Sequence, residues 1–234
     1  MTAAAEDAVE LAAWARLLSL GFGRPDEEAL ADVAALARGL SARSGDADLA
    51  VLLAPLDAEA LRGEYAALFE GKVRCSPYEG SYEADPFRQA REMADVVGFY
   101  RAFGADAAAA QRPDHAGCEL EFLAFLALKR EEALRRGEVE LAERCREAED
   151  SFLRDHLGRW FPTFCRGVAA ETSLPFYACL ARLGERLVAA ELARRGLEPE
   201  PLPPRRRLPL EADTFECAGA CGTPPGAPVP SPSW

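Results

Sequence analysis

Histidine is scarce in this 234-residue sequence, which contains only His115 and His156. Two histidines that lie far apart in the chain do not supply a histidine-rich metal site. The sequence also lacks a glycine-rich phosphate loop, a nucleophile elbow and a paired-histidine metal motif. Because no nucleophile and base can be paired, we expect a protein that is not an enzyme and that holds no cofactor.

Long apolar runs and an excess of basic residues are absent as well. No stretch of about 18 uninterrupted apolar residues is present, so we expect no membrane-spanning helix. Residues 1–11 lack the basic and apolar regions of a secretory signal, which favours a cytoplasmic protein. With 27 Lys and Arg against 39 Asp and Glu, the formal net charge is −12. This acidity argues against a nucleic-acid partner, and it either favours a cationic partner or only keeps the protein soluble.

The cysteines do not form a regular framework for disulfides. Seven are scattered through the chain, and four of them lie in helical patterns, where a free cysteine behaves as a small apolar residue: Cys118, Cys145, Cys165 and Cys179. This distribution predicts a reducing compartment. Cys217 and Cys221 stand apart near the C-terminus and are separated by three small residues. They hold a soft metal, form a disulfide or have no role of their own, and a structural zinc site would need two more ligands.

Strand-like alternation and internal repeats are missing, whereas apolar residues recur at helical spacing through most of the chain. The pattern predicts helices over residues 6–20, 26–40, 49–53, 57–69, 86–100, 114–136, 138–156, 158–170 and 173–196. The helix after residue 114 is apolar over so much of its girth that we expect it at the centre of the fold. We therefore predict an all-α protein with a single helical-bundle domain over residues 1–196.

A proline-rich tail over residues 197–234 follows this domain. It contains ten of the seventeen prolines and three arginines in a row: Arg205, Arg206 and Arg207. Such a composition does not bury enough apolar surface to offset its ordering entropy, so we expect the tail to be extended or flexible.

One helix start combines several polar residues. In Pro113-Asp114-His115 an aspartate follows a proline, and we predict that Asp114 is the N-cap. His115 is either a packed ring or the polar centre of a binding site, and the helix N-terminus favours its neutral form. We expect His156 on the surface near a helix C-terminus, where a cation is favoured.

A loop over residues 70–85 interrupts the helical pattern. It contains Tyr78 and Tyr82, and it follows directly on Tyr65 and Phe69. Aromatic residues on a loop are either packed into the core or presented to a ligand. The sequence leaves both possibilities open.

Three segments, taken in order, carry a family resemblance. They are Tyr65-x-x-Leu68-Phe69, Ser76-Pro77-Tyr78-Glu79-Gly80-Ser81-Tyr82 and Pro113-Asp114-His115-x-x-x-Glu119-Leu120-Glu121-Phe122-Leu123. Their order and spacing resemble the TorD/DmsD/NarJ family of redox-enzyme maturation chaperones, over about residues 6–195 and without the tail. The resemblance implies an all-helical, cytoplasmic chaperone domain of the TorD-like type without enzymatic activity.

The same resemblance implies a partner and a binding surface. Members of that family bind the apo form of a molybdopterin-dependent oxidoreductase subunit, often through its N-terminal twin-arginine leader peptide, and delay its export until the cofactor is inserted. By position, the resemblance assigns these residues to the surface that binds the leader or the client: Tyr65, Phe69, Pro77, Tyr78, Ser81, Tyr82, Asp114, His115 and Glu119. Carboxylates suit the guanidinium groups of such a leader, and Glu79, Asp114 and Glu119 supply them.

Two alternatives are left open. One is a chaperone of the nitrate-reductase-assembly kind, whose client need not be exported. The other belongs to a different class and is a metal or thiol-redox carrier that uses Cys217 and Cys221. The protein is a monomer or a homodimer, and the sequence does not decide between the two.

Overall fold

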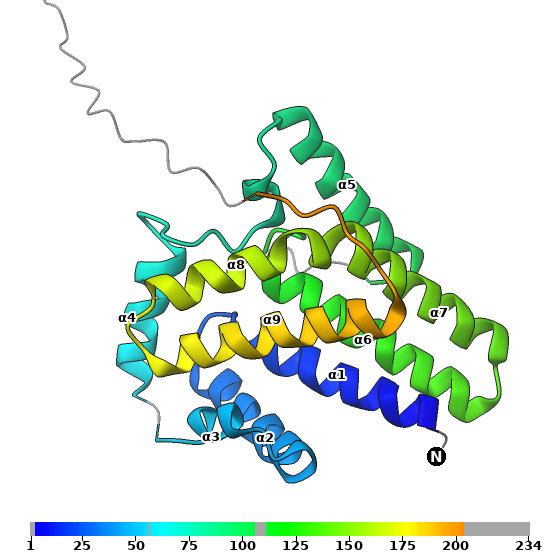
Figure 1. Ribbon diagram of the computed structural model, residues 1–234, viewed down its shortest axis with the longest axis horizontal. Helices are drawn as coiled ribbons and strands as arrows, with labels where there is room; N and C mark the ends of the chain where they lie inside the picture. Colours follow the sequence, from blue (N-terminus) through cyan, green and yellow to red (C-terminus); the bar gives the residue numbers. More distant parts are fainter. Residues whose placement is uncertain (1–2, 56, 106–110, 204–234) are drawn as a thin grey trace, which may run out of the picture.

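A computed structural model describes residues 3–55, 57–105 and 111–203 of the chain. Every regular element in these ranges is a helix, which confirms the predicted all-α class (Figure 1). The elements are α1 (Ala3–Gly21), α2 (Glu27–Ser44), α3 (Ala47–Leu52), α4 (Ala58–Phe69), the 3₁₀ turn η1 (Glu79–Tyr82), α5 (Pro86–Ala102), α6 (Ala116–Arg136), α7 (Val139–Phe152), the π turn η2 (Leu153–Leu157), α8 (Gly158–Glu171) and α9 (Pro175–Arg195). In the described part of the chain, no helix is both long and apolar enough to cross a membrane.

The helix starts and ends follow from local chemistry. Four helices begin after an aspartate whose carboxylate accepts a hydrogen bond from a free backbone N–H group of the first turn: Asp26, Asp46, Asp57 and Asp85. α6 and α9 end at Gly137 and Gly196, which have φ angles of 74° and 66°. Only glycine adopts this left-handed conformation without strain, so these two helix ends were predictable from the sequence.

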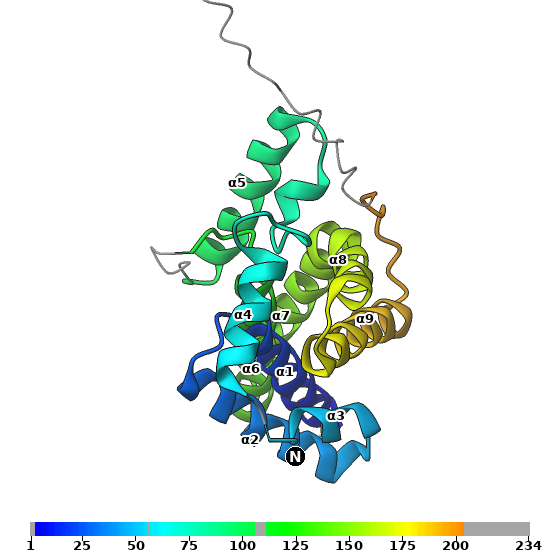
Figure 2. The ribbon, with the colours of Figure 1, turned by 90° about the vertical axis from the view of Figure 1, so that its left-hand side faces the viewer.

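α6 lies at the centre of the fold, as predicted from the apolar residues that surround most of the helix. It packs most extensively against α1 and also against α7, while α8 packs against α9. Leu120, Leu123 and Leu126 of α6 are fully buried. Figures 1 and 2 show α5 standing out from this bundle. α5 also packs against η1. The loop that contains η1 therefore lies where α5 meets the bundle.

The turn η2 joins α7 to α8 without a break in the helical backbone. A side chain at Gly158 would collide with the carbonyl oxygen of Leu153, so the tight passage into α8 requires glycine. The prediction that His156 lies on the surface is wrong, because this residue is fully buried. A π turn shifts the helical register, and here it turns His156 inward against Phe99 and Phe152.

The first residues of the proline-rich tail pack against the bundle. Residues 197–203 are not helical, and Leu202 is buried, with its backbone N–H donating to the carbonyl of Arg159 at 2.7 Å. The expectation of an extended or flexible tail concerns mainly residues 204–234, which lie outside the described residues together with Cys217 and Cys221.

Four helical cysteines serve as small apolar residues. Cys145, Cys165 and Cys179 are buried, and Cys118 is half-buried. Burial raises the pKa of the Cys118 thiol to about 11 and that of Cys179 to about 12. Thiols with such pKa values are almost entirely protonated at neutral pH and react slowly.

Candidate functional site

The structure brings the aromatic loop onto the start of α6. The carbonyl of Pro77 accepts a hydrogen bond from the N–H of Ala116 at 2.8 Å, and the N–H of Glu79 donates to the carbonyl of Asp114 at 2.9 Å. Tyr78 and His115 form a short antiparallel bridge between these contacts. We call this region, residues 76–82 together with residues 112–119, the junction. It unites most of the site residues that the family resemblance assigns.

Asp114 does not cap α6. The N-cap is His115, whose Nδ1 accepts a hydrogen bond from the N–H of Gly117 at 3.0 Å. The chain enters the helix one residue later than predicted, which leaves the carboxylate of Asp114 free to turn toward the loop. There it accepts a hydrogen bond from the N–H of Gly80 at 3.2 Å, and Asp114 is buried.

Arg112 completes the environment of Asp114. Its Nε and Nη2 atoms donate to the two carboxylate oxygens at 3.0 and 2.7 Å. The same guanidinium lies 4.6 Å from the centroid of the Tyr78 ring. The side chain of Arg112 is 50% exposed, whereas that of Asp114 is 2% exposed. The junction therefore holds one guanidinium group between a buried carboxylate and an aromatic face, at the protein surface.

His115 is a neutral, buried ring. Its Nδ1 accepts from the N–H of Gly117 and lies 3.1 Å from Nε2 of Gln111, so the ring proton belongs on the other nitrogen. Burial lowers the pKa of His115 to about 4. This agrees with the neutral form that the helix N-terminus favours. The ring also packs edge-on against Tyr78 at 5.3 Å between centroids.

Glu119 is a buried carboxyl group that does not face solvent. Trp160 donates an indole N–H to its Oε2 at 3.0 Å, while Oε1 has no hydrogen-bond partner in the described residues. Burial, reinforced by the neighbouring carboxyl of Glu79, raises the pKa of Glu119 well above its usual range. The protonated form is therefore favoured. Its hydrogen bond with Trp160 joins α6 to α8 in the interior of the protein.

The structure buries three of the aromatic residues assigned to the site and leaves Tyr78 partly exposed. Tyr65 and Phe69 pack edge-on inside the core with ring centroids 5.1 Å apart, and Tyr82 packs against Trp160 at 5.3 Å between centroids. None of these three predicted residues is more than 8% exposed. Tyr78 remains half-buried at the surface. Of the other two predicted residues, Pro77 is buried, and half-buried Ser81 shares a 2.6 Å hydrogen bond with Ser76.

Sequence reasoning missed a polar pair next to the junction. Nδ1 of His156 lies 3.0 Å from Oε2 of Glu79, and both side chains are buried. The two residues lie 77 positions apart. No local pattern connects them, and the charged sequence of α7 gave the opposite expectation for His156. Arg112 was also missed, although a cation two residues before an aspartate was visible in the sequence.

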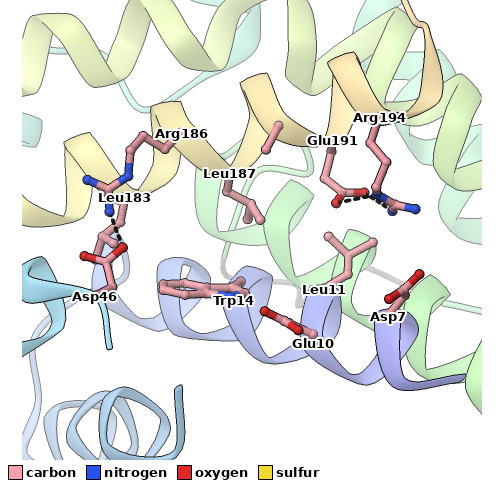
Figure 3. A pocket seen from close by; sticks show the side chains of 11 residues that line it. Asp7, Glu10, Leu11, Trp14, Asp46, Leu183, Arg186, Leu187, Glu191 and Arg194 are labelled. Atoms are coloured by element: carbon pink, nitrogen blue, oxygen red, sulfur yellow. Dashed lines mark hydrogen bonds and ion pairs between the residues drawn. The ribbon is translucent and has the colours of Figure 1, made fainter. Parts of the chain in front are cut away.

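A separate groove runs between α1 and α9, away from the junction (Figure 3). It encloses about 330 Å³, and apolar side chains line its middle: Leu11, Trp14, Leu183 and Leu187. Ion pairs stand toward its two ends, Arg186 with Asp46 and Arg194 with Glu191. None of the residues that the resemblance assigns lies in this groove, which makes it a useful control surface.

The junction lies within a stretch that matches a known protein family. Residues 27–166, more than half of the chain, match the family described as the nitrate reductase delta subunit. The chain belongs to this family. The resemblance to redox-enzyme maturation chaperones is thereby confirmed, and the nitrate reductase delta subunit match includes the whole junction and His156.

Two curated proteins that are similar to this member of the nitrate reductase delta subunit family are named as assembly chaperones. The selenate reductase assembly chaperone protein of Thauera selenatis is 38% identical over 143 residues, which are 59% of this chain and 72% of the relative. The chlorate reductase assembly chaperone protein of Ideonella dechloratans is 36% identical over 151 residues, which are 62% of this chain and 75% of the relative.

A solved structure shares the fold. It is the crystal structure of a proposed redox enzyme maturation protein from Archaeoglobus fulgidus, with a TM-score of 0.52 and 25% sequence identity. The similarity covers 76% of this chain and 93% of that chain. The helical fold described above is therefore the fold of that maturation protein.

Proposed function

We propose that this protein is an assembly chaperone that binds the apo catalytic subunit of a molybdopterin-dependent oxidoreductase in the cytoplasm. It acts by binding and not by catalysis, and it holds the subunit until the cofactor is inserted. Where the subunit carries a twin-arginine leader peptide, it binds that leader and delays export. The family and the two relatives named as assembly chaperones of reductases support this function.

The structural observation that best supports this proposal is the guanidinium site at the junction. The carboxylate of Asp114 accepts two hydrogen bonds from one edge of the Arg112 guanidinium, and Tyr78 lies against the same group. A leader arginine has this chemistry, so we propose that it takes the place of Arg112 between Asp114 and Tyr78. Arg112 then acts as a placeholder that keeps the buried carboxylate paired while no client is bound.

The other assigned residues divide by their exposure. Half-buried Tyr78 and Ser81 contact the client directly in this proposal. The buried residues hold the loop and the helix start in register, so that the client meets a preformed surface: Tyr65, Phe69, Pro77, Tyr82, His115 and Glu119. The formal net charge of −12 speeds the encounter with a basic leader.

A chaperone of the nitrate-reductase-assembly kind is the alternative within the same family, and the family description as nitrate reductase delta subunit supports it. The client of such a chaperone need not be exported. Such a client presents an N-terminal segment without two consecutive arginines. It would use the junction less, and substitutions at Arg112 would change its affinity little.

Peptide titrations of the purified chain test the proposal. The probes are a leader peptide with two consecutive arginines and the same peptide with two lysines, which do not form the bidentate contact. Arg112→Ala should tighten the arginine peptide about five-fold, because releasing a half-exposed ion pair is worth about 1 kcal/mol. Asp114→Asn should weaken it, and the lysine peptide should respond little to either change.

Arg146→Ala is the matched control. It removes the same charge from an arginine of α7 that is 47% exposed and lies outside the junction. If both arginine substitutions tighten binding equally, only the net charge matters and the placeholder role is wrong. If neither peptide binds the wild-type chain, the leader is not recognised, and the client uses another segment or the function is different.

A further inference from the structure

A second polar cluster lies beneath the junction, where three separate elements meet. Glu79 belongs to η1, Glu92 to α5 and His156 to η2. One ligand atom from each residue lies within 4.8 Å of the others. His156 and Glu79 are buried, at 0% and 1% exposure, and the side chain of Glu92 is 22% exposed. The cluster therefore combines one imidazole and two carboxylates at a site that is buried at Glu79 and His156 and partly open at Glu92.

Both nitrogens of the His156 ring face carboxylates. Nδ1 lies 3.0 Å from Oε2 of Glu79, and Nε2 lies 3.4 Å from Oδ2 of Asp95. Although it is buried, Nε2 makes no hydrogen bond within the described residues. A neutral imidazole has one proton, so it donates to only one of these two carboxylates. The nitrogen that faces the other carboxylate then has a lone pair beside an anion. A cation between them relieves this arrangement, and that cation is either a second proton on the ring or a metal ion.

The charges around the ring are not balanced. Glu79, Glu92 and Asp95 supply three carboxylates, and Arg159 is the guanidinium in contact with them, 3.2 Å from Oε1 of Glu92. With a neutral imidazole this leaves a net charge of about −2, and with a protonated imidazole about −1. The side chain of Asp95 is 60% exposed, so solvent screens part of this charge, whereas Glu79 is buried and its charge without compensation is costly.

The outer part of the same cleft does not supply the missing charge. The whole cleft encloses about 550 Å³ and is lined by Glu92, Asp95 and Arg159 on the side of the cluster. Its remaining lining residues are three arginines and three acidic residues: Arg88, Arg91, Arg154, Asp155, Glu198 and Glu200. Arg154 is paired with Asp155 at 2.5 Å, and Arg88 lies 3.9 Å from Glu83. These groups nearly cancel one another, so the deficit at the His156 ring persists.

We propose that Glu79, Glu92 and His156 bind one divalent transition-metal cation, with Asp95 as an outer carboxylate that fixes the imidazole tautomer. One imidazole with carboxylate oxygens and water suits Mn²⁺, Fe²⁺, Co²⁺ or Zn²⁺. The 3.0 Å separation between Nδ1 and Glu79 equals the span of two adjacent ligands around an ion with bonds of about 2.1 Å. Metal-bound histidines commonly donate their second N–H to a carboxylate, which is the role of Asp95.

The cation would connect η1 to both α5 and η2. Glu79 follows Tyr78 directly in the chain, so the site fastens the loop that forms the outer face of the junction. Of its three residues, Glu79 also belongs to the junction, but its buried side chain faces His156 and not the surface that we propose for the client. It goes beyond the proposed chaperone function and holds or fails independently of it.

Titration of the chelator-treated, full-length chain with Mn²⁺ tests the site, with free Mn²⁺ followed by electron paramagnetic resonance. We expect one saturable Mn²⁺ per chain, displaced by Zn²⁺. Glu92→Gln should weaken binding at least ten-fold, and the ion should raise the melting temperature of the wild type but not of this variant. The same result with Cys217→Ser and Cys221→Ser together would exclude the tail thiols as ligands.

Glu198→Gln is the matched control, because it removes the same charge from an exposed residue of the same cleft. Its affinity for Mn²⁺ should equal that of the wild type. His156→Gln should abolish binding, with circular dichroism to confirm that the variant is folded, and the Glu92 comparison decides the question if it is not. The proposal is overturned if no saturable binding of Mn²⁺ or Zn²⁺ occurs, or if Glu92→Gln and Glu198→Gln weaken it equally.

Discussion

Acid should destabilise this protein through His115, and the size of the effect follows from the structure. The ring is buried, its Nδ1 accepts the N-capping hydrogen bond of α6, and its pKa is lowered to about 4. An unfolded histidine has a pKa of about 6.5. Between these values the unfolded chain binds a proton that the folded chain does not, so stability falls as the pH falls through this window.

The magnitude is measurable in a standard unfolding experiment. At about 1.36 kcal/mol per pKa unit, full protonation of His115 lowers the free energy of unfolding by about 3 kcal/mol. About 2.5 kcal/mol of this loss has occurred by pH 4.5. His115→Asn keeps a capping oxygen for the N–H of Gly117 but does not titrate in this range. Between pH 7.5 and pH 4.5 the free energy of unfolding of the wild type should therefore fall by about 2.5 kcal/mol more than that of the variant, as measured by urea denaturation.

The comparison isolates one residue because all other titrating groups, including His156, are present in both proteins. The variant should also be somewhat less stable than the wild type at pH 7.5, because the edge-on contact with Tyr78 is lost. If the two proteins lose stability in parallel as the pH falls, His115 is not a neutral buried cap and the description of the α6 start is wrong.

Two further predictions concern buried carboxylates and are checked by urea denaturation. Glu119→Gln should match or exceed the wild type in stability at pH 8, because the raised pKa of Glu119 makes its ionisation costly as the pH rises. Glu119→Ala should lose about 2 to 4 kcal/mol, because it leaves a cavity and an indole N–H of Trp160 without an acceptor. A Gln variant that is less stable than the Ala variant would refute this. Glu149 accepts hydrogen bonds from Arg130 and Arg195, whose side chains are 8% and 6% exposed, so Glu149→Gln should cost about 3 to 5 kcal/mol. A loss below about 1 kcal/mol would mean that these cations are not buried as described.

The helices were predictable from the sequence because their causes are local. Apolar spacing places α6 at the centre, and Gly137 and Gly196 end α6 and α9 through a backbone conformation that glycine adopts readily. The resemblance also brought the right segments together, since the loop of residues 76–82 does lie on the start of α6.

The details of the junction were not predictable because they depend on tertiary contacts. Asp114 and His115 both carry a side-chain acceptor, and only the fold decides which of them caps α6 and which turns toward Gly80. The burial of His156 depends on the π turn η2, whose shift of register no amphipathic pattern reveals. Its partner Glu79 comes from a loop with no periodicity at all.

Binding to the client remains the central claim, and one measurement tests it most directly. The purified chain is titrated with the catalytic subunit of a molybdopterin-dependent oxidoreductase, once as the apo form and once with its molybdopterin cofactor inserted. The proposed function predicts stoichiometric binding of the apo subunit, weakened at least ten-fold once the cofactor is in place, and unaffected by Trp14→Ala in the α1–α9 groove. Equal affinity for both forms, or no binding to either, would contradict the role of an assembly chaperone.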